Sequence, residues 1–361
     1  MHICFFPHSI EFSNNALFEN APMSEFRKQL MSYGIECDTD DCCNPEKSEV
    51  LAFHRLDLVI GRIHKTIRNN EKCKLFLFSF EEPVICGLHE EGVLPFLDLD
   101  RVFCWRDDFL DYKNIIKANI PQAFLSIKND GVSFSDRKLI VAIDGNKKSR
   151  HPNEAYSLRR DTLKGLYYSG IKVDMFGRGW EKSCDKILKS IWKGEINDKI
   201  SIQNQYKFTL CIQNSKGYPG DICEKIFDAF DAKSIPIYHG APNIGVHIPK
   251  ECFIDLREFK NTVELAKFII NFSEEEYVAM MAHVQNYFSS TDISKFSGGA
   301  LADIVAGELL DIEKNIGFRR SRDSIIWTFG ISLNLIKSLR YVPRITKLRS
   351  LRCILKSLFI K

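Results

Sequence analysis

The segment 208–229 holds the densest group of residues that could bind an anion. An apolar run ends at Asn214, a glycine-rich loop with Tyr218 follows, and a helical pattern then begins with Glu224 and Lys225 in its first turn. The start of a helix offers unpaired backbone N–H groups and the positive end of the helix dipole, which favour phosphate. Lys225 adds a cation, and Glu224 could accept hydrogen bonds from sugar hydroxyls.

Two of these residues also have simpler interpretations. Asp221 and Glu224 have the spacing of a capping box, which would make Glu224 a structural residue. Asn214 could be an ordinary turn residue after a strand. Both alternatives stay open from this segment alone.

Short apolar runs alternate with helical patterns along most of the chain, which predicts an α/β protein with parallel sheets. We predict strands at the following apolar runs: 2–6, 58–60, 74–80, 101–105, 138–144, 171–177, 207–213, 234–240 and 252–256. Helices are expected at about 16–33, 153–169, 181–191, 221–232 and 262–288. A polar break near 128–137 suggests two Rossmann-like domains that face a cleft. In open sheets of this kind, ligands bind beyond the carboxyl ends of the strands.

Composition limits the class of protein. The chain has 361 residues, 45% hydrophobic and 27% charged, which is typical of soluble globular domains and favours two of them. No apolar stretch approaches the length of a membrane span, and the first residues resemble a core strand rather than a signal peptide. The 12 cysteines are mostly scattered and form no Cys-x-x-Cys pair, which indicates reduced thiols in a cytosolic protein.

Several segments together resemble glycosyltransferase family 10, the α1,3/α1,4-fucosyltransferases. The motifs that carry the resemblance are Gln213-Asn-Ser215, Ile222-Cys-Glu-Lys225, Ile235-Pro-Ile-Tyr-His-Gly-Ala-Pro-Asn243 and Phe253-Ile-Asp-Leu-Arg-Glu-Phe259. Their order and spacing over about fifty residues match the family pattern. The chain departs from it at Asp221, where the family often has Tyr, and at Cys223, where it has Thr.

Weaker matches extend the resemblance over roughly residues 74–260. They are Phe80-Glu-Glu-Pro83, Val102-Phe-Cys-Trp-Arg-Asp107, Glu154-Ala-Tyr-Ser-Leu-Arg159 and Val173-Asp-Met-Phe-Gly-Arg-Gly-Trp180. The family implies a GT-B fold and an inverting transfer of fucose from GDP-fucose. We therefore expect an acceptor-binding domain at 1–136 and a donor-binding domain at 137–317.

A single inverting displacement needs a general base on the acceptor hydroxyl and charge relief for the departing diphosphate. Glu81 matches the glutamate of the family's Glu-Ser-Pro segment and follows an apolar strand, so we predict it as the base. Its neighbour Glu82 is the alternative.

The resemblance also suggests which residues hold the donor. Lys225 and Arg159 are the predicted diphosphate cations, because a guanidinium can grip two phosphate oxygens. Asn214 and Glu224 are expected to hold ribose or fucose hydroxyls. Tyr218 is expected to take the place of the tyrosine that the family often has at the position of Asp221, next to the nucleotide base. Arg178 and Lys147 could line the same site, or they could be a surface-turn arginine and a solvated loop lysine.

We predict no essential metal or other cofactor. No Asp-x-Asp motif accompanies the donor segments, and Asp98-Leu-Asp100 lies in the N-terminal half, where we interpret it as a loop. Cations and a helix N-terminus could stabilise the leaving group instead.

The C-terminal segment 318–361 is strongly basic. It carries eleven Lys or Arg and one acid, a charge of +10, so the rest of the chain carries −7 within a net charge of +3. Apolar residues within 344–361 recur at helical spacing with basic residues between them, which predicts an amphipathic tail. We expect it to bind anionic lipid at the inner face of the cytoplasmic membrane. The alternative is a terminal helix packed on the body, and nucleic acid is not expected as a partner.

The expected acceptor is a hydroxyl of a glycan, at O3 or O4 of N-acetylglucosamine in a bacterial surface polysaccharide or lipopolysaccharide. Two alternatives stay open. The first is a transferase of the same fold that uses another nucleotide sugar, and the second is a non-catalytic glycan- or lipid-binding protein.

Overall fold

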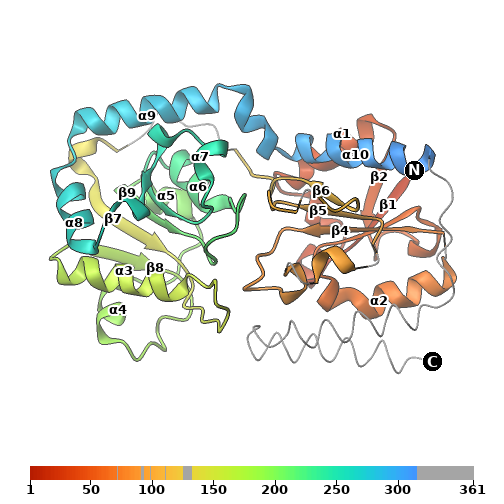
Figure 1. Ribbon diagram of the computed structural model, residues 1–361, viewed down its shortest axis with the longest axis horizontal. Helices are drawn as coiled ribbons and strands as arrows, with labels where there is room; N and C mark the ends of the chain where they lie inside the picture. The colour runs from red at the N-terminus through yellow and green to blue at the C-terminus, as the bar shows by residue number, and fades with distance from the viewer. Residues whose placement is uncertain (71, 91–92, 98, 110, 125–131, 315–361) are drawn as a thin grey trace. The chain divides into compact units, whose positions relative to one another are not determined.

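The computed structural model describes residues 1–70, 72–90, 93–97, 99–109, 111–124 and 132–314, which fall into two compact units. The first unit contains Met1–Ala123 and the described residues from Ser294 to Lys314, and the second contains Phe124–Ile293 (Figure 1). Each unit is built on one parallel β-sheet, as the alternation of apolar runs and helical patterns predicts.

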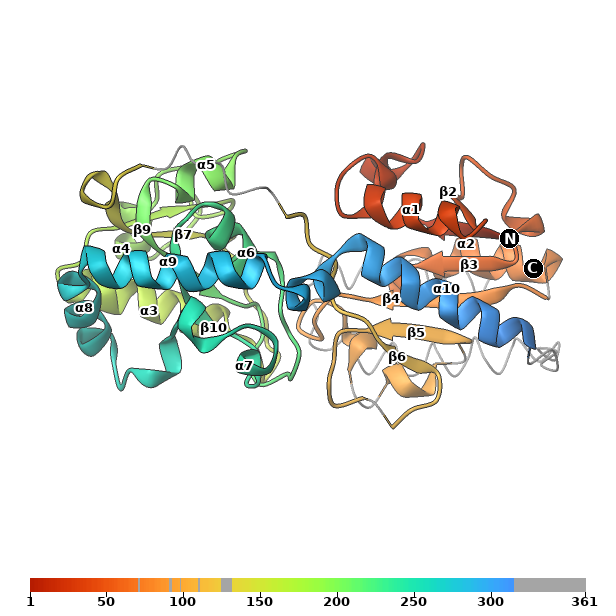
Figure 2. The ribbon, with the colours of Figure 1, turned by 90° about the horizontal axis from the view of Figure 1, so that it is seen from above.

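The first unit has a six-stranded parallel sheet in the order β2-β1-β3-β4-β5-β6. Its strands are β1 (His2–Phe6), β2 (Glu36–Thr39), β3 (Val50–Phe53), β4 (Lys74–Ser79), β5 (Arg101–Cys104) and β6 (Ile115–Lys117). Its α-helices are α1 (Met23–Ser32), α2 (Leu56–Asn69) and α10 (Gly298–Lys314). Alternate residues of β1 and β3 enter two different apolar cores: one face packs on α2, and the other on α1 and α10 (Figure 1). Seen from above, α10 lies over the strands of this sheet (Figure 2).

The predicted strand at 58–60 is wrong, because these residues lie inside α2. Leu56, Val59, Ile60 and Ile63 are all buried, so the apolar run is part of a helical stripe with three- and four-residue spacing. A short apolar run does not distinguish a strand from a buried helix segment. The strand that pairs with β1 comes earlier, at Val50–Phe53.

The second unit has a five-stranded parallel sheet in the order β11-β10-β9-β7-β8. Its strands are β7 (Lys138–Ile143), β8 (Val173–Phe176), β9 (Tyr206–Ile212), β10 (Ile235–His239) and β11 (Ile254–Asp255). Its α-helices are α3 (Tyr156–Tyr168), α4 (Lys186–Ile191), α5 (Lys199–Gln203), α6 (Glu224–Asp231), α7 (Ile244–His247), α8 (Thr262–Asn271) and α9 (Glu274–Phe288). The central strands β7 and β9 are neighbours, so their carboxyl ends bring the loops that follow them together.

The predicted domain limits are 1–136, 137–317 and 318–361. The structure assigns the last described residues to a different unit than these limits do. Helix α10 packs on α1 and contributes Leu301, Val305 and Leu309 to a core of the first unit. The chain therefore returns to the first unit at Ser294 rather than staying with the second to residue 317. The predicted tail, 318–361, lies outside the described residues, and its role stays a prediction.

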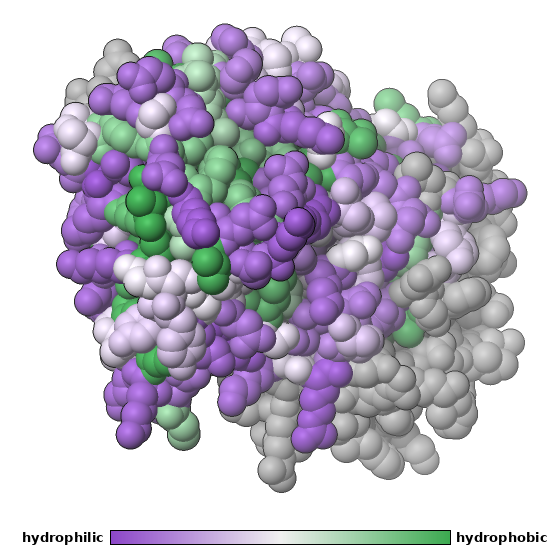
Figure 3. Space-filling view, turned by 60° about the vertical axis from the view of Figure 1, so that its left-hand side comes forward, coloured by the Kyte–Doolittle hydropathy of each residue, from purple (hydrophilic) through white to green (hydrophobic). Residues whose placement is uncertain are grey.

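The face of the molecule in Figure 3 is largely hydrophilic, with separate apolar groups between the polar ones. Apolar side chains exposed on α8 and α9 include Val263, Phe268, Ile270 and Val278. Within the part of the chain that the structure describes, no helix combines the length and the apolarity that a membrane crossing requires.

Two glycines of α10 predict opposite effects of the same substitution. A Cβ at Gly298 would collide with the backbone of Pro22 and Phe26, whereas a Cβ at Gly307 would meet open space. We expect Gly298→Ala to destabilise the protein by about 1–3 kcal/mol through overpacking. Gly307→Ala should stabilise it by about 0.5–1 kcal/mol, since alanine is the better helix former. Thermal unfolding of both variants checks this, and equal shifts would contradict the packing of α10 on α1.

Candidate functional site

The predicted donor cations meet at one carboxylate, that of Asp144, in the second unit. Asp144 directly follows β7 and is buried. Its Oδ1 lies 2.8 Å from Nζ of Lys225, and its Oδ2 lies 3.1 Å from Nε of Arg159. The three side chains form one ion-paired group, which we call the Asp144 cluster.

Arg159 comes from α3 and ties this cluster to the end of β9. Its Nη2 donates to the carbonyl oxygens of Ile212 at 2.6 Å and Gln213 at 3.2 Å, and lies 3.5 Å from Oδ1 of Asn214. Only 2% of its side chain is exposed, compared with 18% for Lys225. In this structure Lys225 is therefore the cation of the cluster that solvent reaches more readily, and Arg159 lies behind it.

The backbone of Asp144 is fixed independently of its side chain. The indole Nε1 of Trp180 donates to the carbonyl oxygen of Asp144 at 2.6 Å. Gly177, with φ at +131°, packs so closely on this carbonyl that a Cβ there would collide with it. The Gly-Arg-Gly-Trp motif thus serves to hold Asp144 in place.

Two opposing effects act on the pKa of Lys225. Burial of the ammonium is the largest single effect and lowers it, but Asp144 and, less strongly, Glu224 and Cys223 together raise it by more, so the pKa lies above its ordinary value despite the nearby Arg159. Lys225 therefore stays charged at neutral pH. With two cations and one carboxylate, the cluster has a formal excess of one positive charge, which suits an anionic ligand.

The family-type motifs build the loops around this cluster through hydrogen bonds. Oδ1 of Asn243 accepts from the backbone N of Gly220 at 2.8 Å, and the hydroxyl of Tyr238 donates to the carbonyl of Asp221 at 3.0 Å. Arg257, paired with Asp255, donates to the carbonyl of Ala241 at 3.3 Å. These residues hold the loop 214–223 against the loop after β10.

The remaining predicted donor residues of this region lie on that loop and at the start of α6. Asn214 is partly buried and its carbonyl accepts from the backbone N of Ala155 at 2.9 Å. Tyr218 is buried, with its ring 6.5 Å from that of His151. Glu224 is the first residue of α6 and is exposed. Asp221 is buried, and its carboxylate accepts a hydrogen bond from the hydroxyl of Ser215. Its carboxylate therefore does not lie exposed at the start of the helix, where a capping box would place it.

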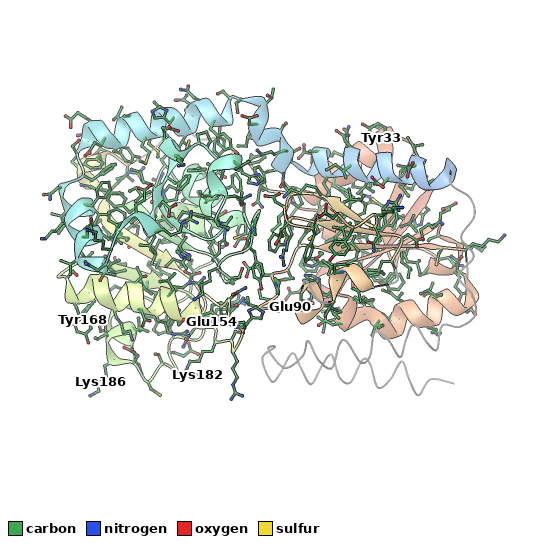
Figure 4. The ribbon with its side chains drawn as sticks, viewed as in Figure 1. Tyr33, Glu90, Glu154, Tyr168, Lys182 and Lys186 are labelled. Atoms are coloured by element: carbon green, nitrogen blue, oxygen red, sulfur yellow. The ribbon has the colours of Figure 1, made fainter. Side chains whose placement is uncertain are left out.

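Arg178 and Lys147 are both exposed in the structure. The Arg178 side chain is 87% exposed and lies 3.5 Å from Glu195. Lys147 is also exposed, and its carbonyl accepts from Arg160 at 2.7 Å. Glu154, on the same β7–α3 connection, accepts from the backbone N of Ser157 at 3.0 Å (Figure 4). Whether Arg178 or Lys147 contacts a donor stays a prediction.

Glu81 lies in the first unit, two residues after β4. It is partly buried, and its carbonyl accepts from Nδ1 of His89 at 2.6 Å. The alternative base, Glu82, is buried. Burial lowers the pKa of His89 to about 4, so this imidazole is neutral at pH 7 and carries its proton on Nδ1.

Sequence reasoning missed Asp144 and Trp180 as parts of the site. The available signals were an aspartate directly after a predicted strand and the tryptophan of a recognised motif. The structure brings Lys225, Arg159 and Asn214 together, with Tyr218 and Glu224 on the adjoining loop and helix start. No group of three or more His, Cys, Asp or Glu with metal-site geometry is found where the structure describes the chain, and metal independence stays a prediction.

Comparison with known proteins agrees with these motifs. Residues 139–293 match the model of glycosyltransferase family 10 (fucosyltransferase), C-terminal part. An α-(1,3)-fucosyltransferase of Helicobacter pylori is 38% identical over 74 residues, which cover 20% of this chain and 15% of that protein. A 3-α-L-fucosyltransferase 9 of Mus musculus is 27% identical over 170 residues, which cover 44% of this chain and 41% of that protein.

Solved structures extend the likeness to the fold of both units. A crystal structure of an α1,3-fucosyltransferase with GDP-fucose has a TM-score of 0.55 at 17% identity, covering 89% of this chain and 93% of that one. The two parallel sheets and this likeness define a GT-B fold. Residues 139–293, most of the second unit, thus carry the C-terminal region of glycosyltransferase family 10. Its matches span less than half the length of the curated relatives.

The buried His89 predicts a loss of stability in acid. Its pKa is about 4 in the folded protein, against about 6.5 in an unfolded chain, so unfolding takes up a proton between these values. The stabilisation is present above about pH 6.5 and is lost as the pH falls toward 4, by at most about 1.4 kcal/mol per pH unit.

We expect His89→Asn, whose amide can still donate to Glu81, to flatten this part of the melting-temperature profile. His283→Asn, at an exposed position of α9, is the control. A profile between pH 7 and 4 that is as steep in His89→Asn as in the wild type would contradict the burial of a neutral His89.

Proposed function

We propose that this protein is an inverting fucosyltransferase that moves fucose from GDP-fucose to a glycan hydroxyl. The observation that carries the proposal is the Asp144 cluster, in which Lys225 is held charged at the start of α6 among family-10 motifs. A cation and a helix start together suit the diphosphate of a nucleotide sugar. The relatives named as fucosyltransferases support GDP-fucose as that donor.

The proposed reaction is one displacement at the anomeric carbon of fucose. Glu81 takes the proton of the acceptor hydroxyl as its oxygen forms the new bond, and the bond to the GDP oxygen breaks on the opposite side. Lys225 stabilises the charge that collects on the departing diphosphate. Arg159, buried behind it, holds Asp144 and the end of β9, and it contacts phosphate if donor binding exposes it.

The other donor contacts follow from position. Asn214 and Glu224 offer amide and carboxylate oxygens to ribose or fucose hydroxyls. Tyr218 lies on the adjoining loop, where it can contact the nucleotide base of the donor. Arg178 and Lys147, both exposed, close around the donor in this proposal. The diphosphate charge is met by side-chain cations and backbone N–H groups, so no metal is required.

The proposed acceptor is O3 or O4 of N-acetylglucosamine in a bacterial surface polysaccharide or lipopolysaccharide. The protein would work in the cytoplasm at the inner face of the membrane, held there by its basic tail, 318–361. The +10 charge of this tail supports attraction to anionic lipid.

A transfer assay tests the proposal directly. The full chain is incubated with labelled GDP-fucose, GDP-mannose or UDP-glucose and a panel of type 1 and type 2 N-acetyllactosamine acceptors, with and without EDTA. We expect fucose alone to be transferred, with the β-linked configuration of the donor inverted to α, and equal rates in EDTA. Transfer of another sugar would favour the alternative nucleotide-sugar transferase, and a rate restored only by Mn²⁺ or Mg²⁺ would overturn the metal-free part.

Glu81→Gln tests the assignment of the base. A positioned general base contributes about 10²–10⁴-fold, so kcat should fall by that factor while GDP affinity is retained. Steady-state kinetics and calorimetry measure the two quantities. Glu82→Gln is the matched variant at the next position, and a larger loss of kcat there than in Glu81→Gln would transfer the role to Glu82.

A further inference from the structure

Four partly buried rings form a continuous row in the first unit, next to Glu81. The ring centroids of Phe12 and His8 are 5.5 Å apart, those of His8 and His54 are 5.6 Å apart, and those of His54 and Phe80 are 6.1 Å apart. All four side chains keep some solvent exposure, so the row is neither core nor fully open surface. We call it the ring row.

The topology places this row at the carboxyl edge of the first sheet. His8 follows β1, His54 is the residue directly after β3, and Phe80 is the residue directly after β4. These three strands are consecutive neighbours in the sheet. This is the edge where parallel α/β sheets bind their ligands, and the residue after Phe80 is Glu81.

The arginine beside the row is paired within the protein. Arg55, directly after His54, is buried and gives two hydrogen bonds to Asp57, at 2.8 and 2.7 Å. Burial and then the positive charges around it lower the pKa of His54 to about 3, and burial with the charge of Arg55 also lowers that of His8, which Glu81 opposes. Both imidazoles are therefore uncharged at neutral pH.

We propose that the ring row binds the acceptor, and that the acceptor residue it binds is an uncharged pyranose. The inference rests on the proposed function and deepens it. The C–H face of a pyranose packs on aromatic rings, and neutral imidazoles both donate hydrogen bonds to hydroxyls and accept them. Arg55, the cation next to the row, is already paired with Asp57, and the carboxylate of Glu81 disfavours an anionic sugar there. A sugar bound there lies beside Glu81, the proposed general base that takes the proton of its hydroxyl.

Steady-state kinetics with GDP-fucose and N-acetyllactosamine tests this in the full chain. We expect His8→Ala and His54→Ala to raise the KM for the acceptor about 3- to 10-fold, the range for losing one aromatic contact. The Kd for GDP, measured by calorimetry, should stay that of the wild type. His8→Phe and His54→Phe keep a ring and should recover part of the acceptor KM, which a general loss of folding would not allow. His283→Ala, exposed on α9, is the matched control.

A binding measurement separates this inference from the proposed function. Saturation-transfer NMR in the presence of GDP detects N-acetyllactosamine on the protein whether or not transfer occurs. Binding that is lost in His8→Ala and His54→Ala supports the ring row, even if the wild type transfers no fucose and the proposed function fails. Unchanged acceptor binding and KM in these variants, or a wild-type protein that binds no neutral saccharide, would overturn it.

Discussion

The ion-paired contact between Asp144, Lys225 and Arg159 is the constraint on which the second unit's candidate site depends. It joins the end of β7, the start of α6 and the first turn of α3 at distances of 2.8 and 3.1 Å. Burying three charges is costly unless each is paired and hydrogen-bonded. Here carbonyl oxygens at the end of β9 accept hydrogen bonds from Nη2 of Arg159, and Trp180 holds the backbone of Asp144. Removing Asp144 would leave two cations uncompensated, a change that costs about 3–5 kcal/mol in comparable buried pairs.

This arrangement lets a buried lysine remain a cation. A lysine without its carboxylate would lose its charge on burial, and with it any attraction for phosphate. The first unit solves the opposite problem beside Glu81. There Arg55 and Asp57 neutralise each other, and burial keeps the nearby histidines uncharged. One unit thus holds a cluster with a formal excess of positive charge, and the other holds Glu81 beside neutral histidines and an internally paired arginine. This division suits the proposed transfer from a nucleotide sugar to a neutral glycan.

The sequence predicts the α/β class and the donor motifs because both depend on local patterns. Apolar runs that end in polar residues place Asn214 and Glu81 at strand ends, and the family motifs locate Lys225 and Arg159. The role of Asp144 was not predictable in this way, since it depends on three segments that meet only in the folded unit. The strand expected at 58–60 failed because a buried helical stripe also contains consecutive apolar residues. Helix α10 packs on α1 of the first unit although the two helices are far apart in the sequence, so a local pattern does not reveal this contact. The close approach of Gly298 to α1 makes it possible.

The most direct test of this account is the GDP affinity of Asp144→Asn as a function of pH. Asp174→Asn is the matched control, because Asp174 is also a buried aspartate of the second unit, with Lys138 and Lys193 nearby. Calorimetry at pH 7 and pH 8.5 should show that the wild type and the control bind GDP alike. Asp144→Asn should bind about tenfold or more weakly, and the ratio should grow at the higher pH as Lys225 loses its proton. Equal affinities at both pH values in a folded Asp144→Asn protein would contradict the central role of this carboxylate.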